Sequence, residues 1–293
     1  MQRLKSLGVL AIVFLCTFAS PAFAKLKIVA SFSILGDMVA QVAGDKADIT
    51  TIVGPDADAH LYMPNVSDAV AVTEADLVFV NGMGFETWSD QLIKSSGSKA
   101  TIAVATDGIT PLLVEGELDP HAWNSLTNGM VYVSNIEAVL SAASPADAAY
   151  FKTNADAYRS ELKALHERAL AEIAKLPADK RVVVTAHDAF GYLESAYGLT
   201  FMAPQGIDTE AEPSAKELAE LIVFLNETGA GALFVENIAN ADLIAQISRE
   251  TGIKIGGRIY SDALSVKGSP ATSYLAMFSH NLELLTTSLA AAN

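Results

Sequence analysis

The chain has 293 residues, with 19 lysine and arginine side chains against 34 aspartate and glutamate side chains, and a formal net charge of −15 at pH 7. This acidic balance argues against nucleic acid and anionic membrane as partners, whereas a cation is compatible with it. With a single cysteine the chain forms no internal disulfide, and its length suits two lobes held by apolar burial or by a bound ligand.

Residues 1–24 have the pattern of a secretory signal peptide. Two basic residues precede an apolar run over residues 7–18, and the segment ends on Ala-Phe-Ala at Ala24. The apolar run is too short for a comfortable membrane span, so we expect cleavage after Ala24 and export to the periplasm. Cys16 follows Leu15, whereas a bacterial lipoprotein signal has a small residue before its cysteine, so no lipid anchor is expected.

Residues 25–144 are predicted to form an α/β lobe. Short β-branched or apolar runs bounded by turn residues predict strands at 27–31, 49–53, 77–80 and 101–105. A helical apolar pattern follows the first strand over residues 34–42 and ends at Gly44.

Residues 145–176 are predicted to form one long helix that links two lobes. Its apolar residues recur at helical spacing: Phe151, Tyr158, Leu162, Leu165, Ala169, Ile173 and Leu176. Ser144 is a candidate cap with Pro145 at the first helical position, and Pro177 favours a stop. At about 1.5 Å per residue the helix would measure on the order of 48 Å, which favours a bridge over a surface helix or a coiled coil.

Residues 177–293 are predicted to form a second α/β lobe. Strands are expected at 182–185, 201–202, 232–235 and 253–255, and helices at 190–196, 214–226, 241–250 and 273–289. Strands that alternate with helices imply right-handed crossovers and a mostly parallel sheet. The expected fold class is therefore α/β, with two lobes of mostly parallel sheet joined by one long backbone helix.

Four side chains with metal-binding chemistry follow predicted strands. They are His60 after the second strand, His121 after the fourth, His187 after the first strand of the second half, and Asp262 after the last. Residues at the carboxyl ends of parallel strands converge even when they are distant in sequence. One such histidine alone is more often an ordinary hydrogen-bonded residue, and it is the joint placement that indicates a site.

Three imidazoles and one carboxylate suit Zn²⁺ in a tetrahedron with bonds of roughly 2.0–2.2 Å. A zinc hydrolase keeps an open water position, so a fourth protein ligand argues against an enzyme, and the sequence has no His-Glu-x-x-His or Gly-x-Ser-x-Gly pattern. A structural or adhesive protein would leave these residues unexplained. His166 and His280 lie within predicted helices without a partner at helical spacing, so we expect them to be structural or solvated.

The stretches around these residues resemble the metal-binding substrate-binding proteins of bacterial ABC transporters for zinc and manganese. They are GPDADAHLYMPNVSDAVAVTEADLVFVNG at 54–82, DPHAW at 119–123, TAHDAFGYLESAYG at 185–198, EPSAKELAELI at 212–222 and YSDALS at 260–265. The resemblance implies two α/β lobes joined by a backbone helix, with a metal site in the cleft between them. The ligands that it implies are His60, His121, His187 and Asp262.

Some positions depart from the pattern of that family. Ala59 stands where proline is usual, Met63 where glutamate is usual, and Asn124-Ser125 where leucine and aspartate are usual. Residues 106–120 lack the histidine-rich loop of many zinc members, but the manganese members generally place glutamate where this chain has His187. Since imidazole favours zinc and carboxylate oxygen favours manganese, Zn²⁺ is the expected transported ligand, with Mn²⁺ or iron as the alternative.

Asp119 and Asp188 lie next to two of the candidate ligands and could accept the second ring proton of a metal-bound histidine, or merely cap a helix. Trp88 and Trp123 could shield the cleft, although packing is the commoner role of a tryptophan. We expect a monomeric periplasmic protein that binds zinc with high affinity and delivers it to an ABC transporter permease in the inner membrane. A metallochaperone is a further candidate partner.

Overall fold

The structure is a computed structural model that describes residues 25–228 and 230–291. The predicted signal peptide at residues 1–24, Cys16 included, lies outside the described residues. Over the part of the chain that is described, no helix combines the length and the apolar character needed to cross a membrane.

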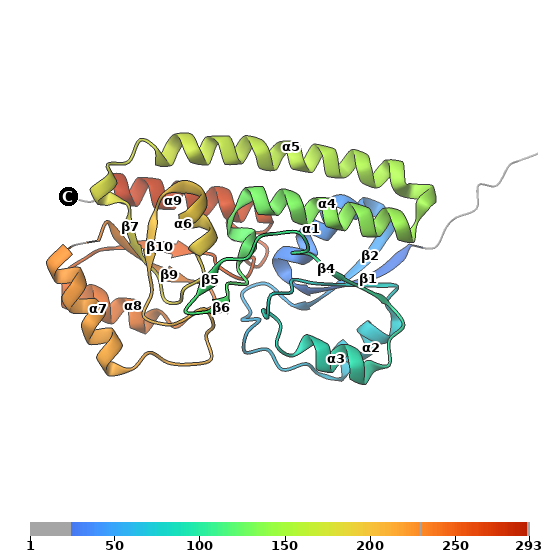
Figure 1. The fold of residues 1–293 in the computed structure, drawn as a ribbon, viewed down its shortest axis with the longest axis horizontal. Helices are drawn as coiled ribbons and strands as arrows, with labels where there is room; N and C mark the ends of the chain where they lie inside the picture. Colours follow the sequence, from blue (N-terminus) through green and yellow to red (C-terminus); the bar gives the residue numbers. More distant parts are fainter. Residues whose placement is uncertain (1–24, 229, 292–293) are drawn as a thin grey trace, which may run out of the picture.

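The N-terminal lobe is built on a four-stranded parallel sheet with the strand order β2-β1-β3-β4. Its strands are β1 (Leu26–Phe32), β2 (Ala47–Val53), β3 (Leu77–Val80) and β4 (Thr101–Val104). Helix α1 (Ser33–Ala43) lies on one side of the sheet, and α2 (Val66–Glu74) and α3 (Ser89–Ser96) lie on the other (Figure 1). Because helices cover both faces, all four residues of β3 are buried.

The C-terminal lobe repeats this plan with a second parallel sheet, in the order β10-β9-β7-β8. Its strands are β7 (Val182–Val184), β8 (Thr200–Met202), β9 (Ala232–Glu236) and β10 (Ile255–Ile259). Its helices are α6 (Gly191–Tyr197), α7 (Ala215–Thr228), α8 (Ala241–Thr251) and α9 (Tyr274–Ala291). The predicted class, two α/β lobes with parallel sheets and a long helix, is confirmed.

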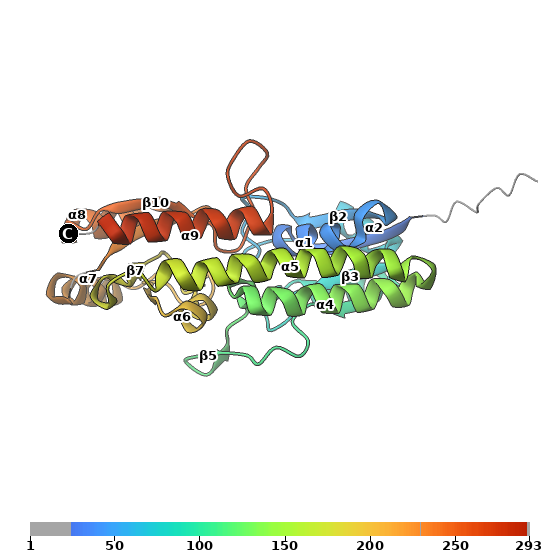
Figure 2. The same cartoon turned by 90° about the horizontal axis from the view of Figure 1, so that it is seen from above.

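The long helix α5 (Ala148–Ile173) runs along both lobes, with α4 (Leu126–Ala143) and α9 on either side of it (Figure 2). All seven apolar residues of the predicted stripe are buried, because α5 packs against α1, α4, α6 and α9. The helix is three residues shorter at each end than predicted. Pro145–Asp147 form a 3₁₀ turn in which the Ser144 hydroxyl donates to Asp147 Oδ2 at 2.7 Å, so Ser144 does not cap α5. The domain boundaries at 144 and 176 stay predictions.

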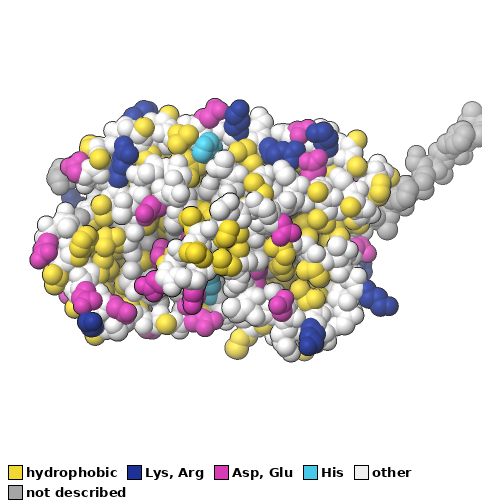
Figure 3. All heavy atoms as spheres, in the orientation of Figure 1, with side chains coloured by type: hydrophobic (Ala, Val, Ile, Leu, Met, Phe, Trp, Pro, Cys, Tyr) yellow, Lys and Arg dark blue, Asp and Glu magenta, His cyan; other side chains and the backbone are white. Residues whose placement is uncertain are grey.

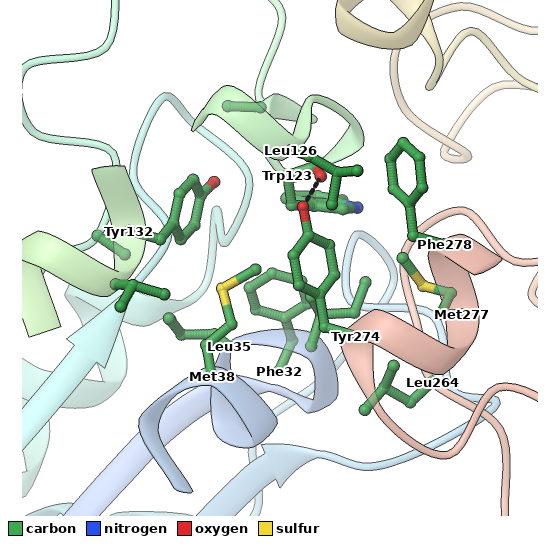
Figure 4. Close-up of a cluster of buried hydrophobic side chains, with 14 of the residues drawn as sticks. Phe32, Leu35, Met38, Trp123, Leu126, Tyr132, Leu264, Tyr274, Met277 and Phe278 are labelled. Carbon is green, nitrogen blue, oxygen red and sulfur yellow. Dashed lines mark hydrogen bonds between the residues drawn. The ribbon is translucent and has the colours of Figure 1, made fainter. Parts of the chain in front are cut away.

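One apolar core is continuous through the two lobes. Figure 4 shows Phe32 of β1 beside Trp123 and Tyr274, and Tyr274 donates its hydroxyl proton to the Trp123 carbonyl. Both Trp123 and Tyr274 are fully buried. A smaller cluster, which includes Leu221 and Ile244, fills the space between the second sheet and helices α7 and α8.

Five segments differ from the sequence prediction. The last strand was placed at 253–255, and β10 instead covers Ile255–Ile259 with Gly256 and Gly257 inside it. Gly256 belongs in this strand because a Cβ there would lie 2.7 Å from the Phe234 ring, so two strands approach closely. Helices α2, α3 and α4 and the antiparallel hairpin of β5 (Leu113–Val114) and β6 (Glu117–Leu118) were not predicted.

Candidate metal centre

The structure brings the four predicted ligands together between the lobes. One potential ligand atom from each of His60, His121, His187 and Asp262 lies within 4.8 Å of the others. His121, His187 and Asp262 have no exposed surface, and His60 is 6% exposed. The cluster is therefore almost fully enclosed, with His60 as its most accessible member.

The three imidazoles point their Nε2 atoms at the carboxylate of Asp262. Oδ2 of Asp262 lies 3.1 Å from His187 Nε2 and 3.2 Å from His60 Nε2, and Oδ1 lies 3.7 Å from His121 Nε2. A tetrahedral zinc ion with bonds of about 2.1 Å holds its ligand atoms about 3.4 Å apart, so this spacing fits a first-row divalent ion. The fit is supported by His60 Nε2, His121 Nε2 and Asp262 Oδ1, which are buried without a hydrogen-bond partner among the described residues.

His60 lies in the loop that follows β2, and this loop is fixed to both lobes. Asp58 Oδ1 accepts a hydrogen bond from the His60 amide at 2.8 Å, while Asp58 Oδ2 accepts from the Thr209 hydroxyl at 2.6 Å. The Trp88 indole donates to the Ala59 carbonyl at 2.9 Å. Trp88 thus holds the His60 loop to its own lobe, and Asp58 ties the same loop to the C-terminal lobe.

His121 lies after the β5–β6 hairpin rather than directly after β4, because residues 105–120 leave the sheet before they return to the cleft. Asp119 Oδ1 accepts hydrogen bonds from the His121 amide at 2.9 Å and from Nδ1 of its ring at 2.8 Å. This contact directs Nε2 toward the cluster, as predicted for Asp119. The Trp123 indole donates to the Ser261 carbonyl at 2.8 Å, so it joins the His121 segment to the residue before Asp262.

His187 follows β7 and extends the parallel pairing through a bridge to Gln205. Its ring lies between two carboxylates, Asp262 at Nε2 and Glu236 at Nδ1, where Glu236 Oε2 is 2.7 Å away. Glu236 was not predicted, although a glutamate at the end of a buried apolar strand is a detectable signal. Glu236 therefore stands where Asp188 was a candidate, and the backbone amide of Asp188 donates to the Gly206 carbonyl.

The carboxylates and imidazoles change one another's protonation. Burial lowers the pKa of His121, but the charges of Asp262 and Asp119 outweigh it and raise the pKa to about 9. Burial likewise lowers the pKa of His187, but Glu236 and Asp262 raise it well above its ordinary value. Burial raises the pKa of Asp262, and the neighbouring His187 and His121 bring it well below the usual range. The metal-free cluster therefore holds protons where a cation would sit.

The two remaining histidines lie away from the cluster. His166 on α5 contacts the Tyr197 hydroxyl through Nδ1 at 3.0 Å, and Nε2 of His280 on α9 donates to the Arg258 carbonyl at 3.0 Å. Both make ordinary structural contacts, as predicted. Aromatic rings pack against two histidines of the cluster. The ring centroid of Trp123 lies 5.4 Å from that of His121, and the ring centroid of Phe85 lies 4.9 Å from that of His60.

The fold and this cluster define a class of protein, the metal-binding substrate-binding proteins of ABC transporters. Residues 28–288 match the family model "Zinc-uptake complex component A periplasmic". The chain belongs to this family. Its members carry a substrate to a transporter rather than convert one, so the protein is not an enzyme, and its partners are a divalent metal ion and a membrane transporter.

Individual relatives agree with this assignment. The chain is 33% identical to a manganese-binding lipoprotein of Halalkalibacterium halodurans over 90% of this chain and 88% of the relative. It is also 33% identical to a manganese ABC transporter substrate-binding lipoprotein of Streptococcus pneumoniae, over 98% of this chain and all of the relative. The periplasmic zinc binding protein of Treponema pallidum has a similar structure, with a TM-score of 0.87, 28% identity, and coverage of 90% of this chain and 99% of that one.

Proposed function

We propose that this protein captures Zn²⁺ in the periplasm and delivers it to the permease of an ABC transporter. The proposed ligands are His60, His121, His187 and Asp262. The observation that carries the proposal is the buried set of three imidazole nitrogens and one carboxylate within 4.8 Å. Nitrogen-rich sets of this kind favour zinc, whereas manganese prefers oxygen ligands.

Manganese is the second candidate, because the Halalkalibacterium and Streptococcus relatives are named for it. Asp262 offers two oxygens that such an ion could use. Zinc binds more tightly than manganese at most sites, so a simple affinity measurement on the parent protein does not reveal which metal the site prefers. The informative quantity is the ratio of the two dissociation constants and its response to the ligand set.

His187→Glu tests the metal and the ligand together. This change exchanges one nitrogen for a carboxylate oxygen, so the ratio of the zinc and manganese dissociation constants should shift toward manganese. Both constants are measured by competition with one chelator. The matched control is His166→Glu, which places the same charge on α5 away from the cluster and should leave the ratio unchanged. A ratio that is the same in both variants and the parent would remove His187 from the ligand set.

We also propose that the mature protein begins at Lys25 and is soluble. Several relatives are named as lipoproteins, but Cys16 here lacks the small residue that precedes a lipidated cysteine. The intact mass of the exported protein distinguishes the two forms. A mass that includes Cys16 with a diacylglycerol would contradict the proposal.

A further inference from the structure

Glu236 is a fully enclosed carboxylate that the proposed ligand set does not include. It is the last residue of β9 and is 3% exposed, and no exposed surface remains on its side chain. Its neighbour in the cluster is His187, whose own side chain is equally enclosed. A buried carboxylate is unfavourable unless hydrogen bonds or an opposite charge compensate for its lost solvation.

Two backbone N–H groups and one ring nitrogen converge on Glu236. The backbone amides of Ala186 and His187 donate to Oε1 at 2.8 and 3.0 Å, and Nδ1 of the His187 ring lies 2.7 Å from Oε2. The glutamate thus holds the backbone of the residue and its ring at the same time. With Nδ1 occupied in this way, Nε2 is the ring nitrogen that points at Asp262, 3.1 Å away.

We infer that Glu236 is a positioning residue for metal binding, which fixes the orientation and the tautomer of His187. The inference rests on the proposed function, in which His187 is a ligand. A proton held on Nδ1 by Glu236 leaves the lone pair of Nε2 free for the metal. Asp119 makes the equivalent contact with His121, so the same arrangement occurs once in each lobe.

A carboxylate can accept from both backbone amides through one oxygen while its other oxygen faces Nδ1 of His187. Its two oxygens both accept, whereas an amide in the same place accepts with one oxygen and donates with its nitrogen. In Glu236→Gln, the amide oxygen of the new side chain should accept from the two backbone amides. The amide nitrogen then faces Nδ1 of His187. Nδ1 must then accept, and the ring proton moves to Nε2, where it blocks the metal.

The test compares Glu236→Gln with Glu86→Gln. Glu86 is also buried and also accepts from two backbone amides, those of Asn81 and Gly82, but its side-chain partner is the Ser31 hydroxyl rather than a histidine ring. Glu236→Gln should weaken zinc binding roughly 10- to 100-fold, the usual effect of removing such a partner. Glu86→Gln should leave the dissociation constant unchanged. Equal effects from the two variants would overturn the inference.

A double-mutant cycle separates positioning from a general structural role. If Glu236 acts through His187, Glu236→Gln should cause no further loss of zinc affinity in a His187→Ala background. The same fold-loss in both backgrounds would show that Glu236 acts elsewhere. In the zinc-bound parent, the ¹⁵N shifts of the His187 ring should show a protonated Nδ1 and a metal-bound Nε2, and the reverse assignment would also overturn the inference. If the parent protein prefers manganese, only the proposal of zinc as the transported metal is contradicted. The role of Glu236 is still tested, because the cycle can be measured with either ion.

Discussion

Among the described residues, each lobe has one buried glutamate near the end of a parallel strand, and the two glutamates have different partners. Glu86 follows β3 and accepts from the Asn81 amide at 2.6 Å, the Gly82 amide at 3.3 Å and the Ser31 hydroxyl. Glu236 ends β9 and accepts from two amides as well, but its second oxygen faces the ring of His187. Glu86 therefore fixes a loop of the N-terminal lobe, whereas Glu236 fixes the backbone and the ring of His187, a proposed ligand.

The pKa values of the two glutamates move in opposite directions. Burial raises the pKa of Glu86, because the hydrogen bonds from Ser31 and Asn81 only partly offset the lost solvation. Burial also raises the pKa of Glu236, but the charge of His187 outweighs it and the net pKa is lowered. A buried carboxylate in the C-terminal lobe is thus stabilised as an anion by the ligand set, which couples it to metal binding.

Asp262→Asn should have the largest effect on this comparison, since Asp262 is the carboxylate that all three imidazoles face. The substitution keeps the shape and removes the anionic ligand. Zinc affinity should fall by more than the roughly 100-fold that outer partners supply. Competition with a chelator measures it, with Asp188→Asn as the control for a neighbouring acidic residue outside the ligand set. A similar loss in both variants would contradict the role of Asp262.

Zinc affinity should rise with pH between pH 7 and pH 9. The pKa of His121 is raised to about 9 in the metal-free protein, so at pH 7 its ring carries a proton that the metal must displace. Each displaced proton lowers the affinity about tenfold per pH unit below the pKa, so the His121 proton alone accounts for about 100-fold between pH 9 and pH 7. The raised pKa of His187 adds to this dependence. A histidine at its ordinary pKa near 6.5 would change the affinity less than about twofold in this window. Affinity that stays flat from pH 7 to pH 9 would show that the cluster is not protonated as described.

The indole hydrogen bonds of Trp123 and Trp88 form a matched pair whose removal should have a smaller effect. Trp123→Phe removes the hydrogen bond to the buried Ser261 carbonyl and should lower the free energy of unfolding by about 1–3 kcal/mol. Trp88→Phe removes the bond to Ala59 from a half-buried indole that water can replace, so about 0.5–1.5 kcal/mol is expected. Denaturant unfolding of the metal-free protein gives both values. A larger loss of unfolding free energy in Trp88→Phe than in Trp123→Phe would contradict this ranking of the two hydrogen bonds.

Removal of the hydrogen bond between Thr209 and Asp58 should have the smallest effect on zinc binding. Thr209→Val removes this hydrogen bond between the lobes, worth about 1 kcal/mol, and should increase the rate of zinc release about fivefold. Stopped-flow transfer of zinc to a fluorescent chelator measures the rate. Thr153→Val is the control, because its hydroxyl only donates to a carbonyl within α5. Unchanged release in Thr209→Val would remove this contact from the closure of the cleft.

The sequence was sufficient for the class of fold and for the four clustered side chains, for an identifiable reason. Strands such as β3 are apolar runs with clear turn signals, and ligands at the ends of parallel strands lie at one edge by construction. The stripe of α5 was visible because its buried residues keep one period through the helix. The zinc preference and the ligand roles of the four residues stay predictions.

Other features depend on contacts between distant segments. The strands β5 and β6 have two residues each, too few to give a periodic signal. Gly256 reads as a turn residue, yet it belongs to β10 because the Phe234 ring occupies the space a side chain would need. Glu236 is 49 residues from His187, and only the pairing of β9 with β7 brings them together.

The most direct test of the metal centre is zinc K-edge X-ray absorption on the protein loaded with one equivalent of zinc. The arrangement of His60, His121, His187 and Asp262 predicts four nitrogen or oxygen neighbours at about 2.0–2.1 Å, with multiple scattering from three imidazole rings. A shell of five or six neighbours, or scattering from fewer than three imidazoles, would contradict the four-ligand site.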